Sequence, residues 1–141
     1  MPYFVLEPEV AGGWGEHTVA DRSSHPPKVT HLHYEFQGWL GDELLESFPC
    51  FIVTQRLANR LRSSQLSGFS LSEAEVSASD KFMERHPGQE LPSFEWLQVL
   101  GTPGVDDFAL SVGARLVVSQ TALDMLQEFP LEYCDVASWP G

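Results

Sequence analysis

The sequence predicts a single α+β domain in which short amphipathic helices pack on a mixed sheet. Its 141 residues, 43% of them hydrophobic, are enough to form one core without disulfides. Runs of β-forming residues alternate with segments whose apolar residues follow helical spacing. One such strand-and-helix pattern occurs twice, which predicts a domain built partly from two similar units.

The two units share one pattern of residue types. FIVTQRLANRL at 51–61 recurs as LVVSQTALDML at 116–126, and the correspondence continues beyond these segments at the same offset of 65 residues. The apolar positions are kept, whereas the expected solvent positions become more acidic. The spacing predicts an internal duplication, with matching strand–helix–strand units at about 51–76 and 116–136.

Each of these helices is predicted to begin after a hydroxyl residue, Thr54 or Ser119, whose side chain caps the free amides of the first turn. We expect the first helix to end before Ser67-Gly68 and the second before Pro130, since Gly and Pro terminate helices. Short extended segments, FSLSEAEV and LEYCDV, then follow.

Residues 1–48 are predicted to hold strands and a loop. YFVLEPEV is typical of a strand stopped by Pro8, and the Gly, Ser and Pro of residues 11–27 indicate a long surface loop. VTHLHYEFQGW alternates apolar and polar residues, which predicts a half-buried strand at 29–36. GDELLESF predicts a short helix capped by Asp42.

Three further segments separate the two units. SASDKFMERHPG predicts a short helix that is stopped by Pro87, and LPSFEWLQVLG predicts a strand. TPGVDDFALSVG, with its Gly and Pro, indicates a loop. Because each amphipathic helix stands among strands, a layered α+β fold follows and a solenoid does not.

The net charge of −12 is concentrated toward both ends of the chain. Residues 1–48 carry eight acidic residues against Arg22 and Lys28, and residues 99–141 carry six against Arg115. Because phosphate contacts require Lys or Arg, such a chain is a poor nucleic-acid binder. The charge either attracts a basic partner or only keeps the protein soluble.

The sequence also bears on location and redox state. No apolar run approaches the roughly 20 residues of a membrane span, and the N-terminus lacks the pattern of a secretory signal. We therefore expect a cytoplasmic protein that does not bind a membrane. Cys50 and Cys134 lie in apolar contexts and are expected to be reduced core residues.

The histidines suggest a metal site only weakly. His31, His33 and Glu35 alternate along one strand face and offer nitrogen and oxygen ligands that suit zinc. They occupy the polar face of a predicted half-buried strand, however, where solvated side chains belong. No established zinc motif accompanies them. The sequence therefore predicts no metal and no cofactor.

No other cluster of residues indicates catalysis. Asp106 and Asp107 follow Gly104, and adjacent residues of an extended chain point apart, so a capping or turn role is favoured over acid–base chemistry. A Gly-x-Ser-x-Gly nucleophile motif is absent. The sequence therefore predicts that the protein is not an enzyme.

The segments FIVTQRLANRL, LSGFSLSEAEVSAS, LPSFEWLQVLG, DDFAL and LVVSQTALDML together resemble a family of small bacterial proteins counted among the immunity proteins of polymorphic toxin systems. The resemblance covers residues 45–137, and we take 49–137 as the family-like repeat region. It implies a cytoplasmic protein that binds and neutralises a cognate toxin. It implies no catalytic residue.

An inhibitor of this kind is expected to meet its toxin through acidic residues that attract a basic surface and through an aromatic anchor. The expected contact residues are Asp106, Asp107, Asp124, Glu128, Trp14 and Trp139. An alternative is a small-ligand-binding protein or an enzyme whose pocket lies between the two units. That pocket would be near Asp106, Asp107 and the strand that carries His31 and His33.

Overall fold

Strand β7 (Cys50–Thr54) is buried along its whole length. Phe51 and Val53 belong to one hydrophobic core, whereas Cys50 and Ile52 belong to another. This division follows from strand geometry, because successive side chains point to opposite faces. The strand therefore separates the two cores of the molecule.

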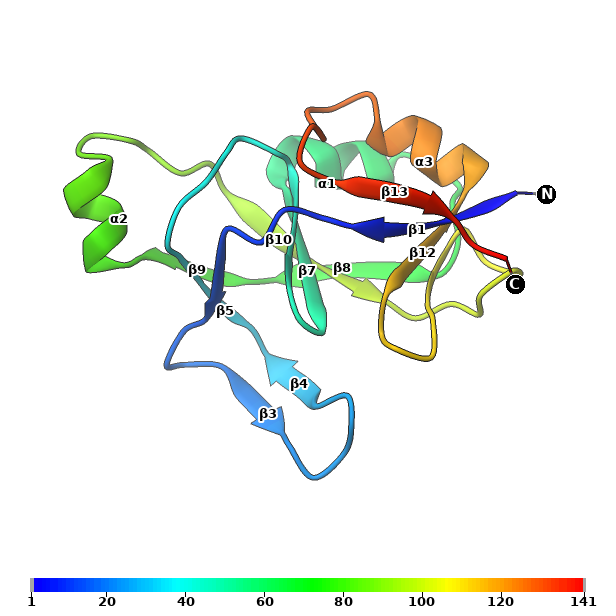
Figure 1. Ribbon diagram of the computed structural model, residues 1–141, viewed down its shortest axis with the longest axis horizontal. Helices are drawn as coiled ribbons and strands as arrows, with labels where there is room; N and C mark the ends of the chain where they lie inside the picture. Colours follow the sequence, from blue (N-terminus) through cyan, green and yellow to red (C-terminus); the bar gives the residue numbers. More distant parts are fainter. Residues whose placement is uncertain (1, 141) are drawn as a thin grey trace.

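The computed structural model describes residues 2–140, which form a single α+β domain with three helices and thirteen strands (Figure 1). The predicted fold class is thus confirmed. Among these residues, none of the helices is long and apolar enough to cross a lipid bilayer.

The first four-stranded sheet has the order β6-β7-β10-β8, with every neighbouring pair antiparallel. Its other strands are β6 (Leu44–Ser47), β10 (Phe94–Val99) and β8 (Phe69–Glu73). Helix α1 (Gln55–Arg62) joins β7 to β8, so the two strands that flank the helix in sequence also flank β10 in the sheet.

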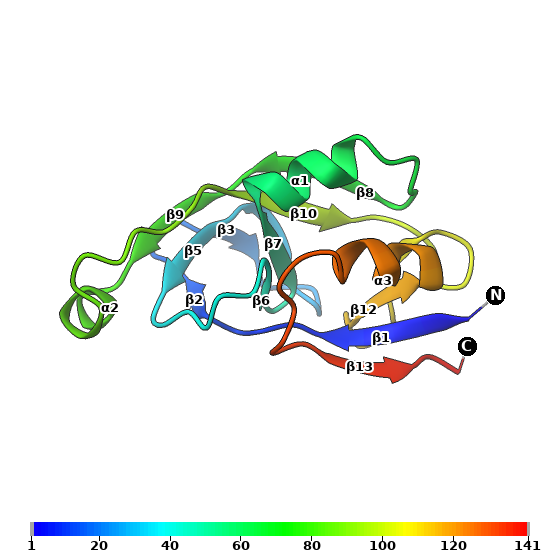
Figure 2. The same cartoon turned by 90° about the horizontal axis from the view of Figure 1, so that it is seen from above.

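The second four-stranded sheet has the order β11-β12-β1-β13 and is also antiparallel. It contains β11 (Phe108–Leu110), β12 (Leu116–Ser119), β1 (Tyr3–Glu7) and β13 (Asp135–Ser138). Helix α3 (Gln120–Leu126) joins β12 to β13. α1 and α3 lie side by side, and their apolar residues share one core (Figure 2).

The remaining strands form two smaller sheets. β2 (Gly12–Trp14), β5 (His33–Phe36) and β9 (Glu75–Ala78) form a three-stranded sheet in which β5 and β9 are parallel. β3 (Val19–Asp21) and β4 (Lys28–His31) form a hairpin that projects from the body (Figure 1). This hairpin and the three-stranded sheet position the histidines described below.

The predicted caps are confirmed. Thr54 Oγ1 accepts the amide of Leu57 and Ser119 Oγ accepts the amide of Ala122. The remaining helix, α2 (Asp80–Arg85), is the predicted short helix before Pro87. Its capping residue has the same extended backbone as the other two caps.

The strand pairings around the two caps correspond. Thr54 lies opposite Phe94 in the first sheet, and Ser119 lies opposite Tyr3 in the second. The middle strands differ in origin, because β10 follows β8 along the chain whereas β1 comes from the start of the chain. That residues 51–76 and 116–136 superpose, and arose by duplication, stays a prediction.

The helix predicted for GDELLESF is wrong, because this segment forms β6. Leu44 and Leu45 are both fully buried, one in each hydrophobic core, as happens when both faces of a strand are covered. Asp42 caps no helix of its own. Its carboxylate instead accepts the amides of Glu132 and Tyr133 at 2.9 and 2.8 Å.

Three other predicted segments need correction. The surface loop at 11–27 contains β2 and β3, and the loop before β12 contains β11. The strand at 29–36 is divided into β4 and β5 at Leu32, which is fully buried. Strands of three or four residues carry too few alternating positions to be recognised from periodicity.

Both cysteines are free thiols. Cys50 is buried, as expected, whereas Cys134 is only partly buried. Burial raises the pKa of each thiol to about 12. Both groups therefore stay protonated near neutral pH, which makes them poor nucleophiles.

Candidate functional site

Asp107, one of the expected contact residues, is used inside the protein. Its Oδ1 accepts a 2.6 Å hydrogen bond from Ser119 Oγ, and its Oδ2 accepts a 2.9 Å bond from the amide of Ser67. The carboxylate thereby joins the start of α3 to the segment that follows α1. The sequence favours a capping or turn role for Asp107; the residue caps no helix itself and instead binds the hydroxyl of Ser119, which caps α3.

Asp106 holds the turn that precedes β11. Its Oδ2 accepts the amide of Thr102 at 2.8 Å. Trp139 lies beside the same turn, because a Cβ added to Gly104 would be 3.3 Å from the Trp139 ring. The ring also packs on Tyr3, with ring centroids 6.0 Å apart in an edge-on arrangement. The structure therefore brings Asp106 and Trp139 into one neighbourhood.

Asp124 and Glu128 belong to α3 and the turn after it. Asp124 Oδ1 accepts a 2.8 Å hydrogen bond from Gln120 one helical turn earlier. Glu128 forms an ion pair with Arg60 of α1, with 3.0 Å between Arg60 Nε and Glu128 Oε1. The basic helix α1 thus neutralises part of the acidic surface that the sequence indicates.

Trp14 lies in β2 of the three-stranded sheet, whereas the other expected contact residues lie in α3 or in segments outside the strands. The guanidinium of Arg22 stands over its ring, 5.2 Å from the centroid. Its buried Nε1 has no hydrogen-bond partner among the described residues. Trp14 and Trp139 therefore do not form one aromatic anchor.

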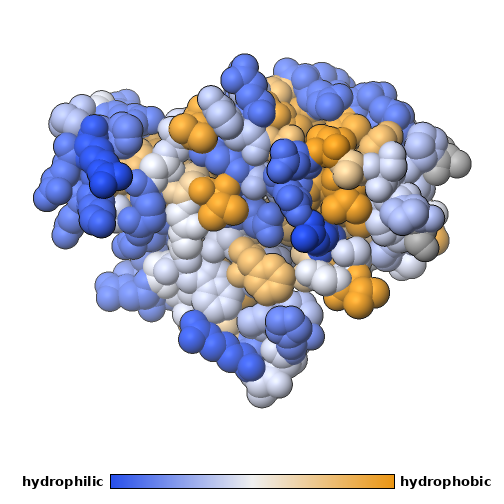
Figure 3. Space-filling model, viewed as in Figure 1, coloured by the Kyte–Doolittle hydropathy of each residue, from blue (hydrophilic) through white to orange (hydrophobic). Residues whose placement is uncertain are grey.

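A groove of about 710 Å³ runs beside β1, where sequence reasoning placed no site. We call it the β1 groove. It is lined by Leu6, Glu7, Pro8, Glu9, Val10, Gly12, Leu40, Glu46, Ser47, Phe48, Gly113, Ala114, Arg115, Tyr133 and Asp135. Four of these apolar side chains are unusually exposed: Val10 (66%), Leu40 (64%), Phe48 (45%) and Tyr133 (48%). In Figure 3, hydrophobic side chains stand among hydrophilic ones on the face shown.

The β1 groove is also acidic. Glu7, Glu9, Glu46 and Asp135 line it against a single cation, Arg115, which pairs with Glu7. Burial raises the pKa of Glu46, and burial is also the main cause of the raised pKa of Glu9. The groove thus combines exposed apolar side chains with excess carboxylate, a pairing that marks recognition surfaces.

Contacts between segments that are distant in sequence form this groove. Glu9 accepts the amide of Leu40 at 2.7 Å and so holds that loop against the end of β1. Asp42 accepts the amide of Tyr133 at 2.8 Å and holds the C-terminal segment beside the same loop. No local motif indicates either contact, which explains why the sequence did not reveal the groove.

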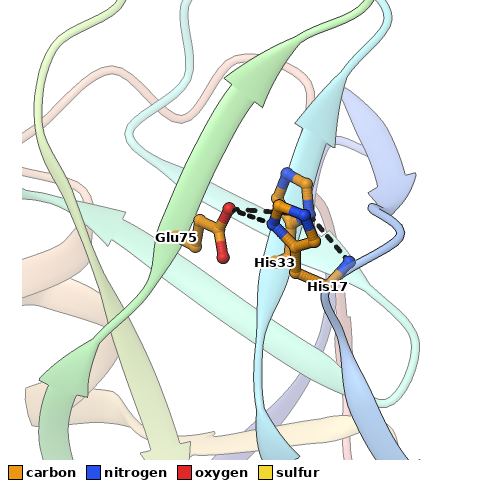
Figure 4. Close-up of side chains that lie close together, drawn as sticks. All are labelled: His17, His33 and Glu75. Carbon is orange, nitrogen blue, oxygen red and sulfur yellow. Dashed lines mark hydrogen bonds and ion pairs between the residues drawn. The ribbon is translucent and has the colours of Figure 1, made fainter.

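The histidines are arranged differently from the sequence expectation. His33 is not solvated, since it is only 4% exposed, and the carboxylate that lies 4.0 Å from its Nδ1 belongs to Glu75 rather than Glu35. His17 joins them, with its ring stacked on that of His33 at 5.0 Å (Figure 4). His31 contacts the other oxygen of Glu75 at 3.1 Å. We call these four side chains the histidine cluster.

The cluster forms because β5 and β9 pair in parallel with His33 directly opposite Glu75. The carboxylate lies 2.6 Å from His17 Nδ1. The hydrogen bond that His17 donates to Glu75 and the negative charge of that carboxylate raise the pKa of His17, and the hydrogen bonds from His17 and His31 lower the pKa of Glu75. The partners of Asp106 and Asp107 are other residues, so the structure does not join the histidines and these aspartates in one site.

A scan of the chain against protein-family models gives no match, and a search of curated proteins finds no significant similarity.

Proposed function

We propose that this protein is an immunity-type binding protein that neutralises a cognate bacterial toxin in the cytoplasm by direct protein–protein contact. The observation that carries the proposal is the β1 groove, where exposed apolar side chains and carboxylates line one concave surface. The family resemblance of residues 45–137 suggests the class of partner. The proposal assigns the protein no reaction and no cofactor.

The chemistry of the β1 groove suits a Lys- or Arg-rich segment of the partner. The aliphatic stems of these residues pack on apolar surface while their charged ends reach acidic groups. Leu40 and Tyr133 offer apolar surface, and Asp135 and Glu46 offer carboxylates close to it. Apolar contacts would supply affinity, and the carboxylates would favour basic partners over others.

The remaining charge has a separate role in this proposal. Asp106, Asp107, Asp124 and Glu128 lie outside the groove and add to a net charge of −12. Charges at the rim of an interface change the rate of association more than the lifetime of the complex. We therefore assign these four residues to steering. Trp139 follows the last residue of β13 and lies beside the turn at Gly104, outside the groove, so the proposal assigns it no contact there.

The test begins with a gene beside this one that encodes a large secreted protein with a toxic C-terminal domain. Co-expression of this chain with that domain should restore bacterial growth, and the purified pair should bind. Leu40→Ala and Tyr133→Ala should each weaken binding about tenfold or more, chiefly through faster dissociation. Met83→Ala, an exposed apolar change on α2, is the matched control.

Charge is tested separately. Asp135→Asn should slow association at low ionic strength and reduce its salt dependence, whereas Glu84→Gln on α2 should not. Failure of the chain to bind the toxin domain or to restore growth would overturn the proposed function. If the groove variants bind the toxin domain as tightly and as fast as the control variants do, the proposed function stands but the β1 groove is not its site.

A further inference from the structure

Four side chains of the histidine cluster come together from four segments of the chain. His17 lies in the turn between β2 and β3, His31 ends β4, His33 begins β5 and Glu75 begins β9. One ligand atom from each of His17, His33 and Glu75 lies within 4.8 Å of the other two. Figure 4 shows both rings and the carboxylate directed at one another.

The best-held member of the cluster is His33. Its ring packs so closely on the backbone of Gly15 that a Cβ there would lie 2.2 Å from it. Its Nδ1 accepts the amide of His17 at 3.2 Å, and its Nε2 lies 2.7 Å from Ser77 Oγ. In a neutral ring this arrangement puts the proton on Nε2 and leaves Nδ1 unprotonated, 4.0 Å from Glu75 Oε2.

These features match what a bound metal requires of histidine. A metal-binding ring uses its unprotonated nitrogen and donates its other N–H to an oxygen, which fixes the tautomer. Ser77 is in place to accept that hydrogen bond. When Nδ1 of His33 binds a metal, the amide of His17, which is part of an exposed turn, is free to bond water.

We propose that His17, His33 and Glu75 bind a divalent transition metal of the zinc class, and that His31 positions the Glu75 carboxylate. Imidazole nitrogen and carboxylate oxygen are ligands of zinc, and three protein ligands leave a fourth position for water. His31 Nε2 contacts Oε1 of Glu75, whereas His17 and His33 face Oε2. The sequence-based expectation of no metal assumed a solvated His33, and that assumption is wrong.

Metal at this position would tie the projecting β3–β4 hairpin to the body of the protein. His17 precedes the hairpin and His31 ends it, while His33 and Glu75 belong to the paired strands β5 and β9. The metal would therefore close both ends of the hairpin onto one parallel strand pair. Binding is accordingly expected to protect the hairpin from local unfolding.

The test uses full-length, untagged protein from which metal has been removed with a chelator. Titration with Zn²⁺ at pH 7.5 is expected to show one site per chain. Affinity should fall at least a hundredfold in His17→Ala and Glu75→Gln, and about ten- to a hundredfold in His31→Ala. His86→Ala, a histidine at the end of α2, should bind as the original protein does.

Two further measurements keep the result interpretable. His33→Ala removes a buried side chain, so circular dichroism must first show that this variant is folded. Zn²⁺ should slow trypsin cleavage after Arg22, an exposed hairpin residue, in the original protein but not in Glu75→Gln. Absence of Zn²⁺ binding, or binding that His17→Ala and Glu75→Gln leave unchanged, would overturn the proposal.

Discussion

Ser119 donates its hydroxyl hydrogen to Asp107 Oδ1 over 2.6 Å while its oxygen accepts an amide of the first turn of α3. Thr54 stands in the same relation to Glu43 and to the first turn of α1, again with 2.6 Å between hydroxyl and carboxylate. Each carboxylate belongs to the residue just before an outer strand of its sheet. The cap therefore fixes both a helix start and a neighbouring strand.

Replacement of Thr54 or Ser119 should destabilise the protein by more than the loss of one helix-capping hydrogen bond. Thr54→Ala and Ser119→Ala each remove an amide acceptor, worth about 1 kcal/mol, and also remove one of the hydrogen-bond donors to a carboxylate. We expect losses of about 1–3 kcal/mol in the free energy of unfolding, measured with urea. Ser63→Ala, at an exposed site, should change it by less than about 0.5 kcal/mol. A Ser119→Ala variant as stable as the original would contradict this account.

The Glu43 carboxylate should make stability decrease in acid. Burial raises its pKa, but hydrogen bonds from Arg56 and Thr54 outweigh burial and hold the pKa below its ordinary value of 4.5. Its contribution is therefore present above pH 4.5 and is lost as the pH falls through the lowered value. We expect Glu43→Gln to reduce the free energy of unfolding at pH 7, with a deficit that shrinks in acid. A deficit independent of pH would contradict the assignment.

The Glu46 carboxylate should have the opposite effect. Burial alone raises its pKa above 4.5. Its contribution to stability is therefore present below pH 4.5 and is lost as the pH rises through the raised value. We expect Glu46→Gln to increase the free energy of unfolding at pH 7 and to give no increase below pH 4.5. Urea titrations at both pH values test this, and a loss of stability at pH 7 would refute it.

Gly68 should tolerate no side chain. Its φ is +94°, and a Cβ would lie 2.1 Å from the carbonyl oxygen of Phe108. Because that neighbour is backbone and the conformation disfavours L-residues, Gly68→Ala should lower stability by about 1–3 kcal/mol or more. Gly113→Ala, where a Cβ meets no atom within 4 Å, serves as the control in thermal melts. Equal melting temperatures for the two variants would show that this turn rearranges freely.

The helices were predictable because their signals are local. Each begins at a hydroxyl residue and carries apolar residues at helical spacing, as Thr54 and Ser119 illustrate. The sequence predicts a helix where β6 forms. Because Leu44 and Leu45 are both buried, on opposite faces of the strand, the strand lacks the alternation of apolar and polar residues by which strands are recognised. Sequence reasoning therefore fails where an element lies between two cores.

The candidate sites were less predictable, since long-range pairing creates them. His31 and His33 attracted attention in the sequence, but His17 and Glu75 did not, because only the parallel pairing of β5 with β9 brings them together. The β1 groove likewise depends on Asp42, which holds the distant Tyr133 by its amide. The spacing of residues along the sequence does not indicate either contact.

The position of β1 between β12 and β13 has a consequence for synthesis on the ribosome. The chain is made from its N-terminus, so β1 leaves the ribosome long before both of its neighbours exist. The β6-β7-β10-β8 sheet, in contrast, has all its strands once residue 99 has emerged. That sheet can fold before β12 has been made, and Tyr3 can pair with Ser119 only after Ser119 has emerged.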